Sequence, residues 1–385
     1  MAKTHTRAYA FLLPVLFVGT LQLSGCLRRE LPPPPPGGMY QSTSAGAQFE
    51  QAVALVGEEG GEVIGNIAEL SIRQIHRVRE EASTIYVTAG GQGVFRTRDE
   101  GATWQQVNQP LSAVTGLVQL RSGILLIGGT NTDGEGVVER SLTGGDSWER
   151  VLTIPALHRR QRQLFEVIKP PPPPSVFVSS IVLDPFNDER IYATTSTGEV
   201  LVGEESGKVW STLSRIQSDK RDPLTNRSIA SIRDVIPSPH QAGELLLITT
   251  DGNMVLIRDS EIAAVELPKG AGNIVDVVFI EQFPGALFVG TDRGALFSRD
   301  LGTSWEEFDL PISTTSPVRN SVVRASPSNP SRLLIAIDSI IYRSEDGGQT
   351  FNTLSLNLPN HIITDIAINP TNAAKVLLST SPVSS

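Results

Sequence analysis

The segment TRDEGATW at residues 97–104 returns as SRDLGTSW at residues 298–305. Weaker copies are SEDGGQTF at 344–351, SLTGGDSW at 141–148 and GEESGKVW at 203–210, while IRDSEIAAV at 257–265 keeps the aspartate but lacks the glycine and the aromatic residue. Self-similarity at a spacing of roughly 40 to 50 residues indicates an architecture built from one supersecondary unit per copy.

Each copy is preceded by a pair of apolar segments that flank a Pro/Asn turn, such as SIVLDPFNDERIYATT and DIAINPTNAAKVLLST. A tight glycine turn, such as AGGQGVF or TTDGNMV, follows them. Each period therefore predicts four short strands joined by turns of defined chemistry. Four-stranded units at this spacing predict an all-β protein, a β-propeller whose twisted sheets pack radially around a channel.

The repeated motif resembles the Asp-box, or BNR repeat, of sialidase-like and related propellers. The resemblance covers nearly all of the chain after its N-terminal segments and implies a conformational role for the motif. Asp99, Asp300 and Asp346 are expected to accept hydrogen bonds from N–H groups of their own turns, and the glycines that follow permit a positive φ. The aromatic residues expected to pack each outer strand onto the next blade are Trp104, Trp148, Trp210, Trp305 and Phe351. The alternative is that these acids and aromatics form acid catalysts or sugar platforms.

The chain ends suggest how the ring closes. Six complete repeats begin at residue 71, and residues 361–385 contain only the first and second strands of a seventh. GMYQS at 38–42 aligns with GVFRT as a third strand and QFEQAV at 48–53 aligns with TWQQVN as a fourth, with Ser44 in the place of the aspartate. We therefore predict a seven-bladed propeller over residues 37–381, in which residues 37–53 complete the C-terminal blade and residues 39–41 pair with residues 376–379.

The first 25 residues are typical of an export signal, because Lys3 and Arg7 precede an apolar stretch that is short for a transmembrane helix. LSGC at residues 23–26 resembles a bacterial lipobox, which implies cleavage before Cys26 and acylation of its thiol, as with palmitate; the alternative is an incidental thiol. Residues 26–36 would then be the lipidated cysteine and a Pro-rich linker with a reach of about 35 Å. We expect a protein that is lipid-anchored to the bacterial membrane, on the periplasmic side, in the outer membrane or at the cell surface.

Removal of residues 1–25 deletes two of the 32 basic residues and no acidic ones, which leaves 30 basic against 41 acidic residues and a net charge of −11. This balance argues against nucleic-acid binding. The five histidines are scattered without metal-ligand spacing, and no phosphate-binding glycine loop precedes a helix. We expect no metal, no cofactor and a monomeric protein.

Two inter-blade loops are unusually long, at residues 153–175 and 214–228, and both are basic within an acidic protein. The candidate partner-binding residues are Arg159, Arg160, Arg162, Lys169, Lys220, Arg221 and Arg227. They are interpreted either as a docking patch for an acidic partner or as charges of solvated loops.

Evidence for catalysis is weak in this sequence. A sialidase would need an arginine triad that begins in an Arg-Ile-Pro context, and RIP does not occur. Asp133, Glu135, Asp251 and Asp292 lie in glycine-turn regions, where aspartate is common for backbone reasons. We therefore predict no catalytic residues and no enzyme.

A lipidated seven-bladed propeller of this size resembles the photosystem II stability/assembly factor group, whose members bind partner proteins. The resemblance implies a membrane-tethered scaffold that binds an envelope or membrane protein. The alternative is an envelope glycan-binding protein or a glycoside hydrolase of the Asp-box type.

Overall fold

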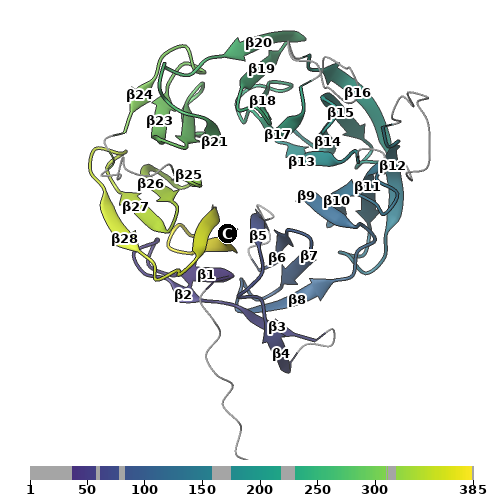
Figure 1. The fold of residues 1–385 in the computed structure, drawn as a ribbon, viewed down its shortest axis with the longest axis horizontal. Helices are drawn as coiled ribbons and strands as arrows, with labels where there is room; N and C mark the ends of the chain where they lie inside the picture. Colours follow the sequence, from purple (N-terminus) through teal and green to yellow (C-terminus); the bar gives the residue numbers. More distant parts are fainter. Residues whose placement is uncertain are drawn as a thin grey trace, which may run out of the picture. The chain divides into compact units, whose positions relative to one another are not determined.

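The computed structural model describes residues 37–57, 61–77, 83–157, 175–217, 230–308, 310 and 318–383. Within these ranges the chain forms thirty strands. No helix there has the length and apolar character needed to cross a membrane. The strands form seven antiparallel four-stranded blades arranged in a ring, one of them extended by a further hairpin (Figure 1). The predicted seven-bladed propeller is confirmed.

The blades follow one another along the chain, each from its inner to its outer strand. Blade 1 contains β5 (Ile72–Arg77), β6 (Ile85–Ala89), β7 (Gly93–Thr97) and β8 (Thr103–Val107), and blade 2 contains β9 (Ala113–Gln119), β10 (Leu125–Thr130), β11 (Gly136–Ser141) and β12 (Glu149–Ile154). Blade 3 contains β13 (Val178–Asp184), β14 (Asn187–Thr195), β15 (Glu199–Glu204) and β16 (Val209–Arg215), and blade 4 contains β17 (Ile232–Pro237), β18 (Leu245–Thr249), β19 (Met254–Arg258) and β20 (Glu261–Val265). Blade 5 contains β21 (Ile274–Phe279), β22 (Leu287–Thr291), β23 (Gly294–Ser298) and β24 (Glu306–Glu307), and blade 6 contains β25 (Ser321–Ser326), β26 (Asn329–Ile337), β27 (Ile340–Ser344) and β28 (Asn352–Ser355).

Blade 7 is built from both ends of the chain. Its strands from inside to outside are β29 (His361–Ile368), β30 (Val376–Pro382), β1 (Met39–Ser42) and β2 (Glu50–Gln51). Met39 pairs with Ser379 and Ser42 pairs with Val376, so the predicted pairing of residues 39–41 with residues 376–379 is confirmed. The ring therefore closes through hydrogen bonds between segments more than 300 residues apart.

In blades 1, 2, 5, 6 and 7 the turn between the third and fourth strands repeats one hydrogen-bond network, as predicted from the motif. In blade 1, Asp99 Oδ1 accepts the N–H of Thr103 at 2.9 Å, and Thr97 Oγ1 accepts the N–H of Gly101 at 3.0 Å. In blade 7, Ser44 Oγ accepts the N–H of Gln48 at 3.0 Å. A hydroxyl thus replaces the carboxylate at the position where the sequence departs from the motif.

Most of the motif tryptophans fasten their blade to the preceding blade, whereas the sequence analysis expected packing onto the next. Their indole N–H groups donate to the carbonyl directly after the preceding outer strand: Trp104 to Ala52 at 2.8 Å, Trp148 to Asn108 at 2.8 Å and Trp305 to Glu266 at 2.9 Å. Trp210 differs, because its N–H donates to Gly207 of its own turn at 2.8 Å. Blade 3 is therefore not anchored to blade 2 by this bond.

The structure adds a hairpin that the repeat count did not predict. β3 (Ala54–Val56) pairs in parallel with β8, and β4 (Val63–Asn66) pairs with β3, so blade 1 becomes a six-stranded sheet. The hairpin lies outside the ring of blades (Figure 1). β4 forms the outer edge of this sheet, and Ile64 on it is 65% exposed.

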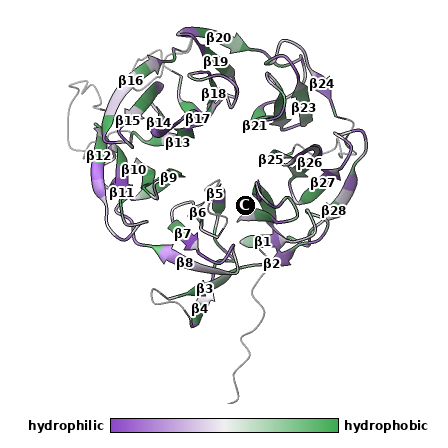
Figure 2. Cartoon of the chain, turned by 180° about the vertical axis from the view of Figure 1, so that it is seen from behind, coloured by the Kyte–Doolittle hydropathy of each residue, from purple (hydrophilic) through white to green (hydrophobic). Residues whose placement is uncertain are grey.

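The hydrophobic core is divided among the interfaces between blades. The cluster that joins blade 7 to blade 1 contains Met39 and Leu377 from the two chain ends together with Ile85 and Trp104. Hydrophobic residues recur along the strands of the blades (Figure 2). Without a disulfide, the ring is held by this packing and by the ladder between β1 and β30.

Candidate functional site

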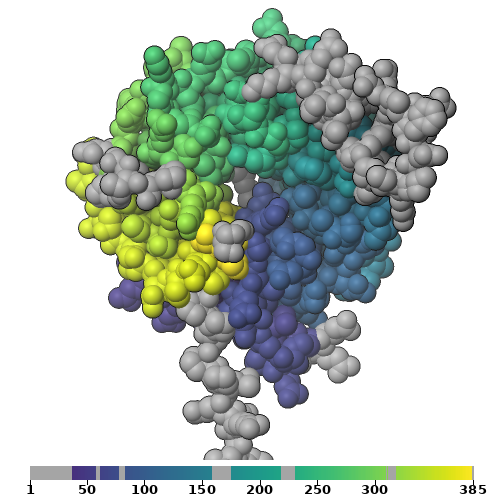
Figure 3. Space-filling view, in the orientation of Figure 1, coloured from purple at the N-terminus to yellow at the C-terminus, as the bar shows by residue number. Residues whose placement is uncertain are grey.

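The inner strands of the blades surround a central hollow (Figure 3). The cavity inside it has a volume of about 560 Å³ and is lined by residues of β5, β9, β13, β17, β21, β25 and β29. All the inner strands except β25 carry a β-bulge near their start. Such bulges re-aim side chains and often lie beside functional sites, so the channel wall is the first candidate.

Several bulged residues connect neighbouring blades. The Arg233 guanidinium donates to the carbonyl of Ile274 at 3.1 Å, and the Thr364 hydroxyl donates to the carbonyl of Ile72 at 2.5 Å. Each acceptor is the first residue of the next inner strand. These polar side chains satisfy backbone groups across the blade interfaces, which is a structural role.

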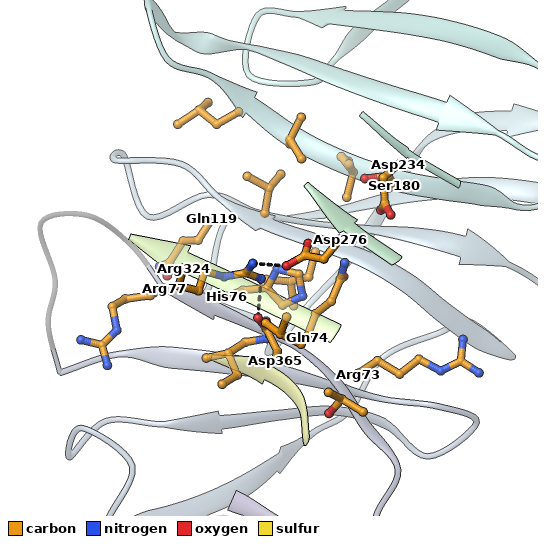
Figure 4. A pocket seen from close by; sticks show the side chains of 18 of the residues that line it. Arg73, Gln74, His76, Arg77, Gln119, Ser180, Asp234, Asp276, Arg324 and Asp365 are labelled. Carbon is orange, nitrogen blue, oxygen red and sulfur yellow. Dashed lines mark hydrogen bonds and ion pairs between the residues drawn. The ribbon is translucent and has the colours of Figure 1, made fainter. Parts of the chain in front are cut away.

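One ionic cluster dominates the channel wall (Figure 4). Arg324 lies between two carboxylates, with Nη1 2.5 Å from Asp276 Oδ2 and Nη2 2.6 Å from Asp365 Oδ1. The same carboxylates accept backbone N–H groups of the following blade, Asp276 from Val323 at 3.1 Å and Asp365 from Ile75 at 2.9 Å. The cluster therefore links blades 5, 6, 7 and 1.

Burial sets the protonation of these groups. Burial raises the pKa of Asp365, and the Arg324 charge opposes this rise. Burial lowers the pKa of Arg324, but the Asp276 and Asp365 charges outweigh it, so the net shift is upward and the guanidinium stays charged. Burial lowers the pKa of His76 to about 4, so this imidazole is neutral at pH 7.

The acids that line the channel are engaged with other groups of the protein. Their partners are Tyr192 for Asp184, Arg121 for Asp188, Arg233 for Asp234, and Arg324 for both Asp276 and Asp365. Carboxylates held in this way neutralise neighbouring cations and fix strands. The contacts of Asp276 and Asp365 join the inner strands of neighbouring blades to one another.

The acids considered from the sequence as catalysts are dispersed among glycine turns. Glu135 accepts from the Asn131 amide at 3.0 Å within the turn that also contains Asp133. Asp251 accepts from the Thr249 hydroxyl at 2.5 Å in blade 4, and Asp292 accepts the N–H of Asn273 at 2.9 Å in blade 5. The contacts of Glu135 and Asp251 lie within their own turns, and Asp292 joins its turn to the connection that precedes blade 5. None of the four acids lines the channel cavity.

The other predicted site residues fall outside the described ranges. These are the lipidation candidate Cys26 and the basic loop residues Arg159, Arg160, Arg162, Lys169, Lys220, Arg221 and Arg227. Their roles stay predictions from the sequence.

Other cations gather on the face that carries the glycine turns and the inter-blade connections, which we call the loop face. Lys269, Arg293 and Arg319 are exposed and belong to the glycine turn of blade 5 and the two connections that flank that blade. Arg293 Nη1 donates to Gly270 beside Lys269 at 3.2 Å, and Val318 beside Arg319 donates to Asp292 beside Arg293 at 3.3 Å. No carboxylate of the described ranges forms an ion pair with any of the three. We call them the blade 5 cations.

A groove lies beside these cations on the loop face. It has a volume of about 670 Å³ and runs between the glycine turn of blade 4 and the connections on either side of that blade. Gln217 and Ala230 line it on one side, and Gly270 and Asn273 line it on the other. Apolar side chains such as Met254 and Leu267 and the carboxylates of Asp251 and Glu266 also line it. The blade 5 cations do not line the groove but lie next to it, beside Gly270.

The sequence contained a signal for the channel aspartates but none for the blade 5 cations. Ile-x-Asp followed by Val or Ile recurs at 232–235, 274–277 and 363–366 and marks the channel aspartates. The blade 5 cations are separated by about 25 residues from one to the next, and only the fold brings them to one face.

No protein-family model matches the chain, and no curated protein matches it in sequence. Solved structures do match it. "YCF48 bound to D1 peptide" superposes with a TM-score of 0.55 at 16% identity, covering 82% of this chain and 93% of that chain. This chain has the fold of YCF48. "YCF48 from Cyanidioschyzon merolae" gives a TM-score of 0.57 at 18% identity over 81% of this chain and 96% of that one.

A third match is the enzyme described as Niastella koreensis GH74, with a TM-score of 0.43 at 12% identity, covering 78% of this chain and 61% of that chain.

The similarity to the two YCF48 structures confirms, at the level of architecture, the resemblance to the photosystem II assembly factor group.

Proposed function

We propose that this chain is an exported, monomeric lipoprotein that is anchored to the bacterial membrane through acylated Cys26. Its propeller binds a segment of another protein and acts as an assembly scaffold in the cell envelope. The scaffold is non-catalytic in this proposal. The bound segment is acidic and extended, and it lies across the blade 5 cations, beside the loop-face groove.

The observation that carries the proposal is the charge distribution. The protein is acidic overall, yet Lys269, Arg293 and Arg319 stand exposed and without an ion-pair partner among the described residues. Most arginines elsewhere are paired, such as Arg332 with Glu345 at 2.8 Å and Arg121 with Asp188 at 3.0 Å. Exposed cations next to a groove attract an acidic partner and orient it.

Two further facts support a protein ligand. A solved structure with the same fold is described as bound to a peptide. The basic loop residues between blades 2 and 3 and between blades 3 and 4 belong, by their place in the repeat, to the connections that contribute to the loop face.

The binding proposal is tested on the native lipoprotein, purified from detergent extract with its partners, followed by affinity measurement with the identified partner. We expect Lys269→Glu/Arg293→Glu/Arg319→Glu to weaken binding at least tenfold and the wild-type affinity to fall with ionic strength. The matched control is Arg98→Glu/Lys208→Glu/Arg299→Glu, which reverses three exposed cations of the opposite face. Unchanged affinity in the triple variant, or turnover of a glycan by the purified protein, would overturn the proposal.

The anchor is tested separately. Cys26→Ser should abolish incorporation of labelled fatty acid and move the protein from the membrane fraction to the soluble fraction. A variant that still carried the label would show that another residue is acylated.

A further inference from the structure

Six of the seven blades place the turn before their outer strand against the preceding blade. Each of these turns contains a glycine whose hydrogen faces an apolar side chain of that blade. The pairs are Gly101 with Leu377, Gly145 with Val107, Gly207 with Leu126, Gly302 with Val265, Gly348 with Phe308 and Gly46 with Leu334. A Cβ on Gly145 would lie 2.7 Å from Val107, so these turns fill their positions tightly.

The contact between blades 2 and 1 shows which residues of one blade receive the turn of the following blade. Tyr86 and Arg96, which are paired neighbours on β6 and β7, both donate to the carbonyl of Gly144, at 3.2 and 2.8 Å. Val107, three residues after Trp104, packs against Gly145 and is only 6% exposed.

Blade 4 lacks this turn. Its third and fourth strands are joined by Asp259 and Ser260 alone, which adopt positive φ values of 50° and 68°. These values are typical of a tight hairpin turn. Ile262 stands where the other blades carry the aromatic residue, and it is 52% exposed.

The missing turn leaves a pocket on blade 3. Tyr192 and Val202 are paired on β14 and β15 as Tyr86 and Arg96 are paired in blade 1, and Leu213 follows Trp210 by three residues. All three line a cavity of about 380 Å³ that Asp259 and Ser260 border from the blade 4 side. Leu213 is 47% exposed, in contrast to its buried counterpart in blade 1. We call this cavity the blade 3 slot.

We propose that the blade 3 slot is a docking site for a turn of a partner protein, one with a glycine at its tip and an aromatic side chain directly after it. The proposal rests on the proposed protein-binding function and adds a second contact at the rim. The occupant is defined by the six turns that fill the equivalent positions within this chain. A second copy of the chain is not a suitable partner, because its own turns already pack between the blades of that copy.

The chemistry of the slot favours apolar recognition. Tyr192 already donates to Asp184 at 2.9 Å and Arg190 to Glu204 at 2.9 Å, so these polar side chains of β14 are engaged within blade 3. Val209 of β16, which pairs with the slot residue Glu204, adds a further apolar side chain that is 52% exposed. Exposed apolar surface of this kind, next to a cavity, is typical of protein-interaction sites.

The slot is tested with a cyclic peptide of residues 298–307, the blade 5 turn with its Trp305, added to the full-length protein. Methyl NMR should show saturable shifts confined to Val202, Leu213 and Ile257. Leu213→Asp should weaken binding at least tenfold, as should Trp305→Ala in the peptide. Leu142→Asp is the matched control, because Leu142 is 64% exposed on the turn of blade 2 and does not line the slot.

A second variant protects the test against misfolding of Leu213→Asp. Replacement of residues 258–261 by the turn of residues 299–304 fills the slot within the chain and should abolish peptide binding while raising the thermal midpoint. Peptide binding should persist in the triple charge-reversal variant of the blade 5 cations, so the two proposals can fail separately. Absent slot shifts, or shifts that Leu213→Asp leaves unchanged, would overturn the docking site.

Discussion

Gly38 is the residue at which the chain enters the propeller, and it provides a sharp test of ring closure. Its carbonyl accepts two hydrogen bonds from Thr380, from the N–H at 2.9 Å and from the hydroxyl at 3.1 Å. Its φ is +77°. A Cβ at this position would lie 2.7 Å from the Ile67 carbonyl oxygen and 2.8 Å from Val53 Cγ1. We expect Gly38→Ala to loosen blade 7.

Two terms set the size of this effect. Holding alanine in the left-handed region costs about 1–2 kcal/mol. Forcing a methyl group into closely packed backbone costs about 1–3 kcal/mol more. The expected loss in the free energy of unfolding is therefore about 2–5 kcal/mol.

Gly91→Ala separates the two terms. Gly91 has a similar φ of +72°, but nothing lies within 4 Å of the position that its Cβ would occupy. This control should lose only the conformational term of about 1–2 kcal/mol. Urea unfolding of both variants gives the comparison through their midpoints. Hydrogen exchange at the Thr380 amide should accelerate in Gly38→Ala alone. Equal midpoints and equal exchange would refute the argument that the chain entry is sterically clamped.

Three further variants test contacts within and between blades. Trp104→Phe removes the buried bond to the Ala52 carbonyl and should cost about 1–3 kcal/mol in urea unfolding. Arg324→Met leaves Asp365 buried without its cation and should cost about 3–5 kcal/mol at pH 8. Because burial raises the pKa of this carboxyl, its protonated form is favoured in the folded state, so the deficit should shrink when unfolding is measured at pH 5. Hydrogen bonds from the side chain and N–H of Thr350 lower the pKa of Asp346 to about 2, so its stabilising contribution is present above pH 4 and is lost as the pH falls toward 2. Asp346→Ser, which copies the hydroxyl found at this position in blade 7, should destabilise less than Asp346→Ala in thermal unfolding and should remove that pH dependence.

The sequence alone determined the number of blades and the way in which the ring closes. The motif turns are made by residues within a few positions of one another, so their hydrogen bonds follow from local chemistry. Even the diverged copy of the motif keeps this bond, because Ser44 Oγ accepts the N–H of Gln48 four residues later. For the same reason, the channel aspartates could have been found from their recurrence at one position of the inner strand.

Only the tertiary structure decided where the surface of this propeller is unusual. The parallel pairing of β3 with β8 joins segments almost 50 residues apart. The gathering of Lys269, Arg293 and Arg319 on one face depends on three separate connections. The loss of the motif in blade 4 is visible in the sequence, but its consequence appears on blade 3, where Leu213 is left uncovered. Contacts between blades join residues that are distant in sequence, and a local pattern does not specify which surface its absence leaves exposed.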